Sequence, residues 1–460
     1  MVEPVVAVIG GGLAGCEAAW QVARQGYVVR LFEMRPTVPT PAHGTDRLAE
    51  LVCSNSLKSE SLEDASGLLK AEMRALGSLI LDCAEATRIP AGSALAVDRD
   101  RFAAAVTEQI AVHPRIQVVR QEVPELPAER PLVVATGPLT SDRLARDLQQ
   151  RFSGAHETHS HVSPSPWLFF YDAISPIVSA DSVDEAIPFW ASRYGKGGDD
   201  YLNCPLTRDQ YLDFRQAMIG GDRYPLHEFE EAKYFEGCLP IEELAGRGED
   251  ALRFGPLRPV GLRDPRTGTR PYAVVQLRQE NRGADGRPSM YNLVGFQTRL
   301  RRGDQLRILR LIPGLQQAEI LRYGSVHRNT FLMTPLLLRE TLEFRGEAGL
   351  FFAGQLTGVE GYLESAATGL LAGINVARLM RGERPVGPPA TTMLGGLLRY
   401  VTQSAPEAFQ PINANFGLLP RLPRIVRNRR ERNRLLADRA LTDFRTWEGT
   451  LHALPAQSAL

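Results

Sequence analysis

The chain has 460 residues, enough for two or three domains that each bury a core. Its 53 basic and 53 acidic side chains cancel, so net charge alone points to no nucleic acid, membrane surface or acidic substrate. Five scattered cysteines exclude a paired C-x-x-C metal motif and indicate a reducing compartment. The sequence shows no basic leader with an unbroken apolar stretch and no apolar segment long enough to span a bilayer. We therefore expect a cytoplasmic protein.

An apolar run followed by a glycine turn stands near the start of the chain. Val5–Ile9 does not alternate with polar residues, which predicts a buried parallel strand. Gly10, Gly12 and Gly15 then occupy the positions of a G-x-G-x-x-G motif. The first glycine allows a tight turn, the second lets a pyrophosphate approach, and the third lets the next helix pack closely. That helix, predicted over Leu13–Arg24, points its partial positive charge at the phosphates.

A second predicted strand, Val28–Phe32, ends at Glu33, about 20 residues past the glycine loop. An acid at this distance holds a ribose hydroxyl of a bound dinucleotide. Strand, turn, helix and acid together predict a dinucleotide-binding domain. Its candidate cofactor-contacting residues are Gly10, Gly11, Gly12, Leu13, Ala14, Gly15 and Glu33.

The next segments continue the α/β pattern. Apolar spacing predicts a helix over Ser66–Leu81 and another over Asp98–His113, followed by a strand at Ile116–Val119. A buried strand over Pro131–Gly137 ends in Ala-Thr-Gly. In flavoproteins of this architecture that strand returns beside the first, and its end passes the cofactor. Gly137 is therefore a further candidate cofactor contact.

The pattern resumes near the end of the chain. Leu350–Gly354 is a strand that ends at a glycine, and a turn at Gly358–Tyr362 leads into a helix over Glu364–Leu379. Small residues on one face of this helix would let the backbone approach an isoalloxazine ring, which adds Gly354 and Gly369 to the candidate contacts. Tight helix packing is the alternative interpretation of the same small residues.

Between these parts the alternation of strands and helices fades. Strand-like runs at Tyr272–Leu277 and Tyr291–Phe296 lie among segments rich in turns, which predicts a separate inserted α/β domain. The predicted fold is a Rossmann-like α/β FAD-binding domain at 1–175 and 321–460, with an inserted substrate- or tRNA-binding domain at 176–320. Its tail, Pro420–Arg445, has nine arginines against three acids, typical of a phosphate-facing helix or of a merely solvated one.

A series of short motifs runs through nearly the whole chain: Gly10–Gly15, Leu31–Pro36, Pro41–Asp46, Val52–Ser56, Ala135–Thr140, Tyr201–Pro205, Phe235–Cys238, Pro259–Leu262, Val274–Glu280, His327–Thr330 and Gly358–Gly369. In this order they resemble the TrmFO family of folate- and FAD-dependent tRNA (uracil-5-)-methyltransferases, which is related to the GidA-type tRNA-modifying flavoproteins. The resemblance implies methylation of carbon 5 of the T-loop uridine of tRNA. It also implies 5,10-methylenetetrahydrofolate as one-carbon donor, reduced FAD as reductant and NAD(P)H as electron source.

Two cysteines fit this chemistry. Carbon 5 of uracil is a poor nucleophile, so a thiolate must first add to carbon 6, and a base must then remove the carbon-5 proton. By the resemblance, Cys238 is the nucleophile and Cys53 is the base near the flavin. Cys16 and Cys83 are interpreted as small buried residues, and Cys204 as structural. The His156–His161 loop departs from the family pattern; its histidines are interpreted as solvated, and no metal site is predicted.

Three alternatives stay open at this point. A GidA-type enzyme would modify the wobble uridine, but the chain is shorter and the Cys238 context argues against it. A small-molecule flavin oxidoreductase would need no RNA. A non-enzymatic flavoprotein would bind tRNA without modifying it. Flavin reduction, folate-dependent methylation and a gel shift with unmodified tRNA would separate them.

Overall fold

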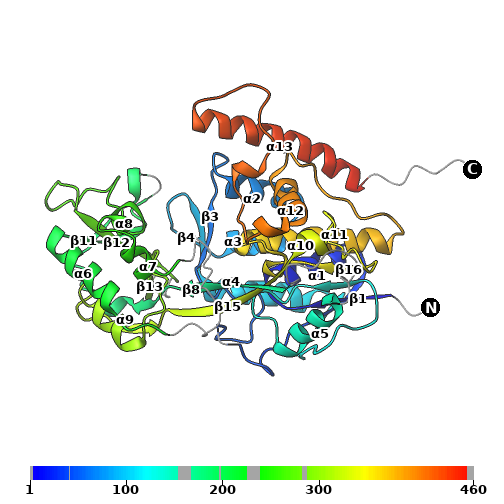
Figure 1. Cartoon of the computed structure of the whole chain (residues 1–460), viewed down its shortest axis with the longest axis horizontal. Helices are drawn as coiled ribbons and strands as arrows, with labels where there is room; N and C mark the ends of the chain where they lie inside the picture. Colours follow the sequence, from blue (N-terminus) through cyan, green and yellow to red (C-terminus); the bar gives the residue numbers. More distant parts are fainter. Residues whose placement is uncertain are drawn as a thin grey trace, which may run out of the picture.

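The computed structural model describes residues 4–40, 42–153, 167–195, 198–224, 239–281 and 287–452. Two bodies lie side by side, one formed by the beginning and the end of the sequence and the other by its middle (Figure 1). Two long strands link the bodies: β8 (Trp167–Ile174) pairs antiparallel with β15 (Ser325–Leu332). The chain therefore leaves the first body and returns to it along one ribbon.

The first body contains a sheet of five parallel strands in the order β16-β7-β1-β2-β6. These strands are β1 (Val5–Ile9), β2 (Val28–Phe32), β6 (Ile116–Val119), β7 (Leu132–Val134) and β16 (Leu350–Phe352). The helices that accompany them are α1 (Leu13–Arg24), α4 (Arg99–Val112), α5 (Asp142–Ser153) and α11 (Tyr362–Met380). Because β7 and β16 are wholly buried, their sequences are unbroken apolar runs. The predicted Rossmann-like α/β class is confirmed.

One predicted helix is wrong. The segment predicted as one helix over Ser66–Leu81 forms two, α2 (Ala65–Ala75) and α3 (Leu79–Ala86). Gly77 separates them in a left-handed conformation with φ of 70°. Ser78 then starts α3 by accepting a hydrogen bond from the Leu81 N–H. The apolar spacing continues across the break because both helices pack on one core, which hid the break from the periodicity.

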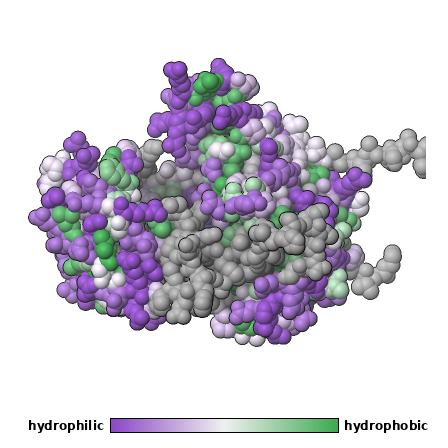
Figure 2. Space-filling model, in the orientation of Figure 1, coloured by the Kyte–Doolittle hydropathy of each residue, from purple (hydrophilic) through white to green (hydrophobic). Residues whose placement is uncertain are grey.

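The first body also contains a three-stranded sheet in the order β3-β5-β4 and three further helices. The elements are β3 (Ser56–Ser59), β4 (Arg88–Ile89), β5 (Ala94–Val97), α10 (Thr334–Leu337), α12 (Met393–Gln403) and α13 (Arg429–His452). Strand β3 and helices α12 and α13 contact α2. Helix α13 crosses over α2 and α12, and its start is covered largely by hydrophilic side chains (Figures 1 and 2). Its other face buries Phe444 and Trp447 in the main core. The charged tail is therefore packed against the first body and is not solvated on all sides.

The second body is built on an antiparallel sheet in the order β10-β11-β12-β13-β9-β14. Its strands are β9 (Ile177–Ser179), β10 (Phe189–Trp190), β11 (Tyr201–Leu206), β12 (Ala273–Gln279), β13 (Met290–Leu293) and β14 (Ile320–Arg322). Its helices are α6 (Arg208–Gly220), α7 (Ile241–Gly246), α8 (Ala251–Phe254) and α9 (Arg302–Leu309). A separate apolar cluster between Val178 and Ala318 holds it together. This cluster supports the domain boundaries expected at 175/176 and 320/321, which stay a prediction.

Short 3-10 turns complete the described elements. They are Ala180–Ser182, Arg193–Gly195, Gln355–Thr357, Pro406–Ala408 and Phe416–Leu418. Within the described ranges, no helix combines the length and the apolar character needed to cross a membrane.

Helix α11 lies directly on helix α1. A Cβ added to Gly369 would stand 2.1 Å from the Ala14 carbonyl oxygen, and one added to Gly373 would stand 2.5 Å from that of Ala18. The two backbones therefore meet with no side chain between them at these points. The small residues of the predicted helix thus serve packing in this structure, while the predicted flavin contact of Gly369 stays untested.

We predict that Gly369→Ala lowers the stability of the protein by about 1–3 kcal/mol, because the new methyl group forces α11 away from α1. The measurement is thermal or denaturant unfolding of the purified protein. Gly449→Ala is the matched control: it lies inside α13 with open space around its Cβ, so it should gain about 0.5–1 kcal/mol. Equal unfolding of Gly369→Ala and wild type would contradict the close helix contact.

Candidate functional site

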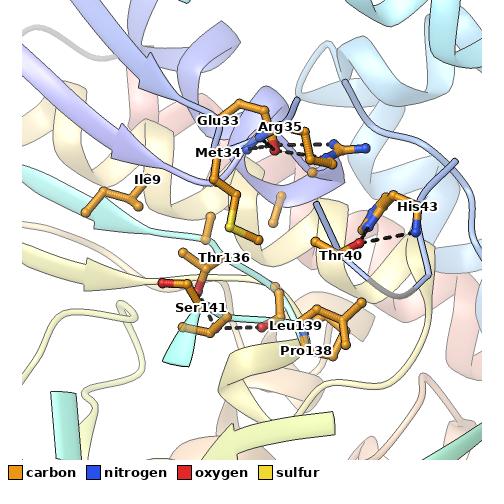
Figure 3. A pocket seen from close by; sticks show the side chains of 18 of the residues that line it. Ile9, Glu33, Met34, Arg35, Thr40, His43, Thr136, Pro138, Leu139 and Ser141 are labelled. Atoms are coloured by element: carbon orange, nitrogen blue, oxygen red, sulfur yellow. Dashed lines mark hydrogen bonds and ion pairs between the residues drawn. The ribbon is translucent and has the colours of Figure 1, made fainter. Parts of the chain in front are cut away.

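A cavity opens at the carboxyl ends of the parallel strands, where open α/β sheets bind ligands (Figure 3). Four segments bound it: the glycine turn after β1, residues 33–35 after β2, residues 135–141 after β7, and Gly354–Gln355 after β16. Its space is about 1030 Å³, including the open mouth.

Most predicted cofactor contacts line this cavity. They are Gly10, Gly11, Gly12, Leu13, Ala14, Glu33, Gly137 and Gly354. The structure places Gly15 and Gly369 behind it, each against neighbouring backbone. A Cβ on Gly15 would lie 1.8 Å from the Gly10 carbonyl oxygen, the close strand–helix packing expected of a third glycine.

Two positions of the glycine turn differ in the space around them: a side chain would not fit at Gly10 but would fit at Gly12. Gly10 has a φ of 106°, and its Cβ would lie 2.4 Å from the Ala135 carbonyl oxygen. Gly12 precedes α1, and no side chain in the described part of the chain caps the helix start there. A Cβ on Gly12 would meet nothing within 4 Å, because it would project into the cavity. The unpaired N–H groups of the first turn of α1 thus face a space free for an anion.

Glu33 is engaged by the protein itself. Its carboxylate accepts hydrogen bonds from Gly11 N (3.0 Å), Arg35 N (2.9 Å) and Arg35 Nε (2.9 Å). Arg35 also pairs with Glu50 at 3.2 Å. Burial acts to raise the pKa of Glu33, but the hydrogen bonds and charge of Arg35 outweigh it and hold that pKa below its usual value. The sequence argument missed Arg35, although it follows Glu33 by two residues in the Leu31–Pro36 motif.

His43 forms another part of the wall. Its Nδ1 lies 2.6 Å from Thr40 Oγ1, and both side chains line the cavity (Figure 3). Burial, and then the positive charge of Arg35, lower the pKa of His43 to about 4. The ring is therefore neutral at pH 7, and Arg35 is the cation on this side of the cavity.

Cys53 lies in a turn at the edge of the cavity, after the lining residue Val52. The N–H groups of Cys53 and Ser54 donate to the Tyr362 hydroxyl at 2.6 and 3.2 Å. Tyr362 is the first residue of α11 and itself lines the cavity. Burial, and then the charge of Cys53, raise the pKa of the phenol, so Tyr362 is neutral at physiological pH. One hydroxyl thus joins the Cys53 turn to the cavity wall.

Two guanidinium groups lie near Cys53. Arg99 pairs with Glu280 (2.8 Å) and donates to the Leu51 carbonyl oxygen (2.5 Å). Burial acts to lower the pKa of Arg99, but Glu280, Tyr362 and Cys53 raise it overall. The pKa of Arg322 is lowered by burial and by Arg99, against the opposing charge of Cys53. Cationic neighbours of this kind favour the thiolate form of a cysteine.

The other predicted residues fall into two groups. Cys238 and the His156–His161 loop lie outside the described residues. Cys16, Cys83 and Cys204 are buried, and burial raises the pKa of each thiol, that of Cys83 to about 12. A buried thiol with a raised pKa is chemically inert, which fits the structural interpretation.

Comparison with known proteins identifies the family. Residues 5–384 match the profile of the family described as glucose inhibited division protein A. The chain is 56% identical over 436 residues to methylenetetrahydrofolate--tRNA-(uracil-5-)-methyltransferase TrmFO of Moorella thermoacetica, covering 95% of this chain and 96% of that protein. It is 55% identical over 447 residues to the protein of the same name from Geobacter sulfurreducens, covering 97% and 99%. The chain belongs to the TrmFO family.

A solved structure supports the fold. GidA of Aquifex aeolicus superposes with a TM-score of 0.66 at 18% identity, covering 98% of this chain and 74% of that one. The likeness therefore extends through both bodies of the chain. The TrmFO relatives match over the same full length, so the cavity, the Cys53 turn and the second body all lie within the shared sequence.

We predict that Gly12→Val yields a folded protein that no longer retains its dinucleotide cofactor, because the side chain fills the space in front of the α1 amides. The measurement is the absorbance of the FAD expected from the sequence, per mole of purified protein. Gly220→Val is the control, since a Cβ at Gly220 also meets nothing within 4 Å but lies at the end of α6. Full FAD content in Gly12→Val would contradict the placement of the cofactor.

Proposed function

We propose that this chain methylates carbon 5 of the T-loop uridine of tRNA. The one-carbon unit comes from 5,10-methylenetetrahydrofolate, and the electrons come from NAD(P)H through FAD. The printed names of relatives that are more than half identical over the full length support the reaction. The observation that carries the proposal in the structure is the Tyr362 hydroxyl, which holds the Cys53 turn at the wall of the cofactor cavity.

The cavity residues fit FAD. The open position at Gly12 and the uncapped start of α1 suit a pyrophosphate. From there the cavity lining continues past Gly137 to Gly354 and Tyr362, on the side of the Cys53 turn. A cofactor with an adenosine part and a flavin part needs a cavity of this extended kind. When bound and reduced, FAD supplies the electrons that turn a methylene unit into a methyl group.

Two thiolates then divide the work on the uracil ring. The sulfur of Cys238, by family resemblance, adds to carbon 6, and the electron pair of the 5,6 double bond moves into an enolate that makes carbon 5 nucleophilic. Carbon 5 takes up the one-carbon unit, the Cys53 thiolate removes the carbon-5 proton, and that electron pair expels tetrahydrofolate, which leaves a methylene group on carbon 5. A hydride, which reduced FAD would supply when bound, turns this methylene into the methyl group and regenerates the enolate. The enolate then eliminates the Cys238 thiolate and restores the 5,6 double bond. The target base must leave its stack for this to happen.

The surroundings of Cys53 suit a base. Arg99 and Arg322 both act electrostatically on Cys53, and cationic groups beside a cysteine are the surroundings in which thiols serve as bases. Tyr362 fixes the turn through two backbone N–H groups, so the sulfur is positioned by the main chain. Arg99 is itself held by Glu280 and by the Leu51 carbonyl.

Surface arginines offer contacts for tRNA phosphates. The sequence suggests two clusters: Arg299, Arg301 and Arg302, and Arg427, Arg429 and Arg430. Arg299 is held by Glu243 (2.5 Å) and is poorly placed for RNA. The arginines of the second cluster are exposed at the start of α13 and just before it. Arg301 and Arg302 of the first cluster are exposed as well, and Arg430 of the second lies 3.7 Å from Glu63, so both clusters stay candidates.

The proposal is tested with undermodified tRNA, FAD, labelled methylenetetrahydrofolate, and NADH or NADPH in separate arms. We predict label in 5-methyluridine of the T-loop. Label on the wobble uridine would support the GidA-type alternative instead, and flavin reduction without labelled tRNA would support a small-molecule oxidoreductase.

The two cysteines are separated with tRNA that carries 5-fluorouridine, which has no carbon-5 proton to release and should trap the covalent adduct. We predict that Cys53→Ala is inactive in methylation but still traps, because addition to carbon 6 precedes proton removal. Cys238→Ala should bind FAD but form no adduct, as judged by a shifted band on denaturing gels. The reverse pattern would exchange the two roles.

A further inference from the structure

The second body presents Arg278 to the Cys53 turn, and no carboxylate of the described ranges pairs with this arginine. Arg278 stands near the end of β12 and is 8% exposed. Its Nη2 donates to Ser54 Oγ at 3.2 Å, beside Cys53, while its buried Nε has no hydrogen-bond partner. No ion pair of Arg278 exists among the described residues. A buried guanidinium without a counter-charge is costly, and a bound anion would remove that cost.

Arg193 of the second body also has buried guanidinium nitrogens that lack hydrogen-bond partners in the described ranges. These nitrogens are Nε and Nη2. Burial, and then the neighbouring positive charge of Arg258, lower the pKa of Arg193. The positive charges of Arg193 and Arg258 therefore act against each other. Such a pair is stable when an anion lies between its members.

Tyr201 links the two arginines. It pairs with Arg278 across β11 and β12, and its hydroxyl donates to the Ala91 carbonyl oxygen at 3.2 Å. Arg193 follows two residues after Ala191, whose N–H donates to the Tyr201 carbonyl oxygen at 3.0 Å. Burial raises the pKa of the Tyr201 phenol, Arg278 and Arg193 oppose that rise, and Asp200 adds to it. Arg278 and Arg193 thus share Tyr201 as a neighbour, and the charge of Arg258 acts on Arg193; we call these three residues the arginine row.

Two acids lie nearby, and neither forms an ion pair with Arg278 or Arg193 in the described part of the chain. Asp200 accepts a hydrogen bond from the Gly92 N–H at 2.5 Å, and Glu280 pairs with Arg99 at 2.8 Å. Beside Arg193, the Tyr194 ring is 61% exposed at a φ of 61°, with its N–H bonded to the Gly261 carbonyl oxygen at 3.0 Å. An exposed aromatic ring beside unpaired arginines is the combination that binds single-stranded RNA, by base stacking and phosphate contact.

We propose that the arginine row binds consecutive phosphodiester groups of the tRNA strand next to the target uridine. Arg278 would hold the phosphate nearest to the reacting base, and Arg193 with Arg258 the phosphate beyond it. The proposal rests on the proposed function, because it takes the uridine to lie at Cys53. Phosphate contacts at this place fix the register of the strand, so that one uridine reaches the cavity.

The test measures the affinity for unmodified tRNA transcript between 50 and 200 mM salt. Each contact with a phosphate releases counterions, so the logarithm of the binding constant falls against the logarithm of the salt concentration by about one unit of slope per contact. Arg278→Gln and Arg193→Gln should each weaken binding by about tenfold near 0.1 M salt and reduce the salt slope by about one unit. Arg278→Lys should retain the slope, because it keeps the charge. Arg208→Gln is the control: this exposed arginine on α6 is paired with Glu249 and should bind like wild type.

FAD content checks the fold of every variant. If Arg278→Gln loses FAD, the decision rests on Arg193→Gln, which lies further from the cavity. Unchanged affinity and slope in the folded variants overturn the proposal. A raised KM for methylenetetrahydrofolate with unchanged RNA binding also overturns it, since the arginines then serve the carboxylates of the folate. Failure of the wild type to bind or methylate tRNA would instead reject the proposed function.

Discussion

The contact between α1 and α11 is the constraint on which the rest of the site depends. Gly369 and Gly373 let α11 lie on the backbone of α1, although 337 residues lie between Arg24 at the end of α1 and Tyr362 at the start of α11. That contact places the start of α11 beside the glycine turn, and with it Tyr362. The Tyr362 hydroxyl then positions the Cys53 turn. The cavity and the Cys53 turn are thus brought together by two glycines that belong to neither.

The charged side chains around the cavity differ between the wall at Glu33 and the side at Cys53. Glu33 and Glu50 both pair with Arg35 within the wall, so this group of three carries one net negative charge. Near Cys53 the balance is positive, since Arg99 has one carboxylate partner and Arg278 has none among the described residues. A positive balance favours both a thiolate and a polyanionic substrate. The two requirements of the proposed reaction are therefore met by the same group of arginines.

Local patterns in the sequence were sufficient to predict the first strand and helix. Val5–Ile9 is an uninterrupted apolar run, and the glycine motif marks the start of Leu13–Arg24. The predicted helix over Ser66–Leu81 was wrong, because the apolar spacing continues through the Gly77 break. Tyr362 was missed as a partner of Cys53, since the hydrogen bond joins residues 309 apart and only folding brings them together. The arginine row was missed for the same reason: its members come from separate turns and strands of the second body.

The most direct test is a crystal structure of the protein with FAD bound. We predict the pyrophosphate against Gly12 and the start of α1, and the isoalloxazine ring between Gly354 and the Cys53 turn, with the Cys53 sulfur facing the ring. A flavin ring on the opposite side of the cavity, away from Tyr362 and Cys53, would contradict the assignment of Cys53 to the reaction and with it the proposed arrangement of the site.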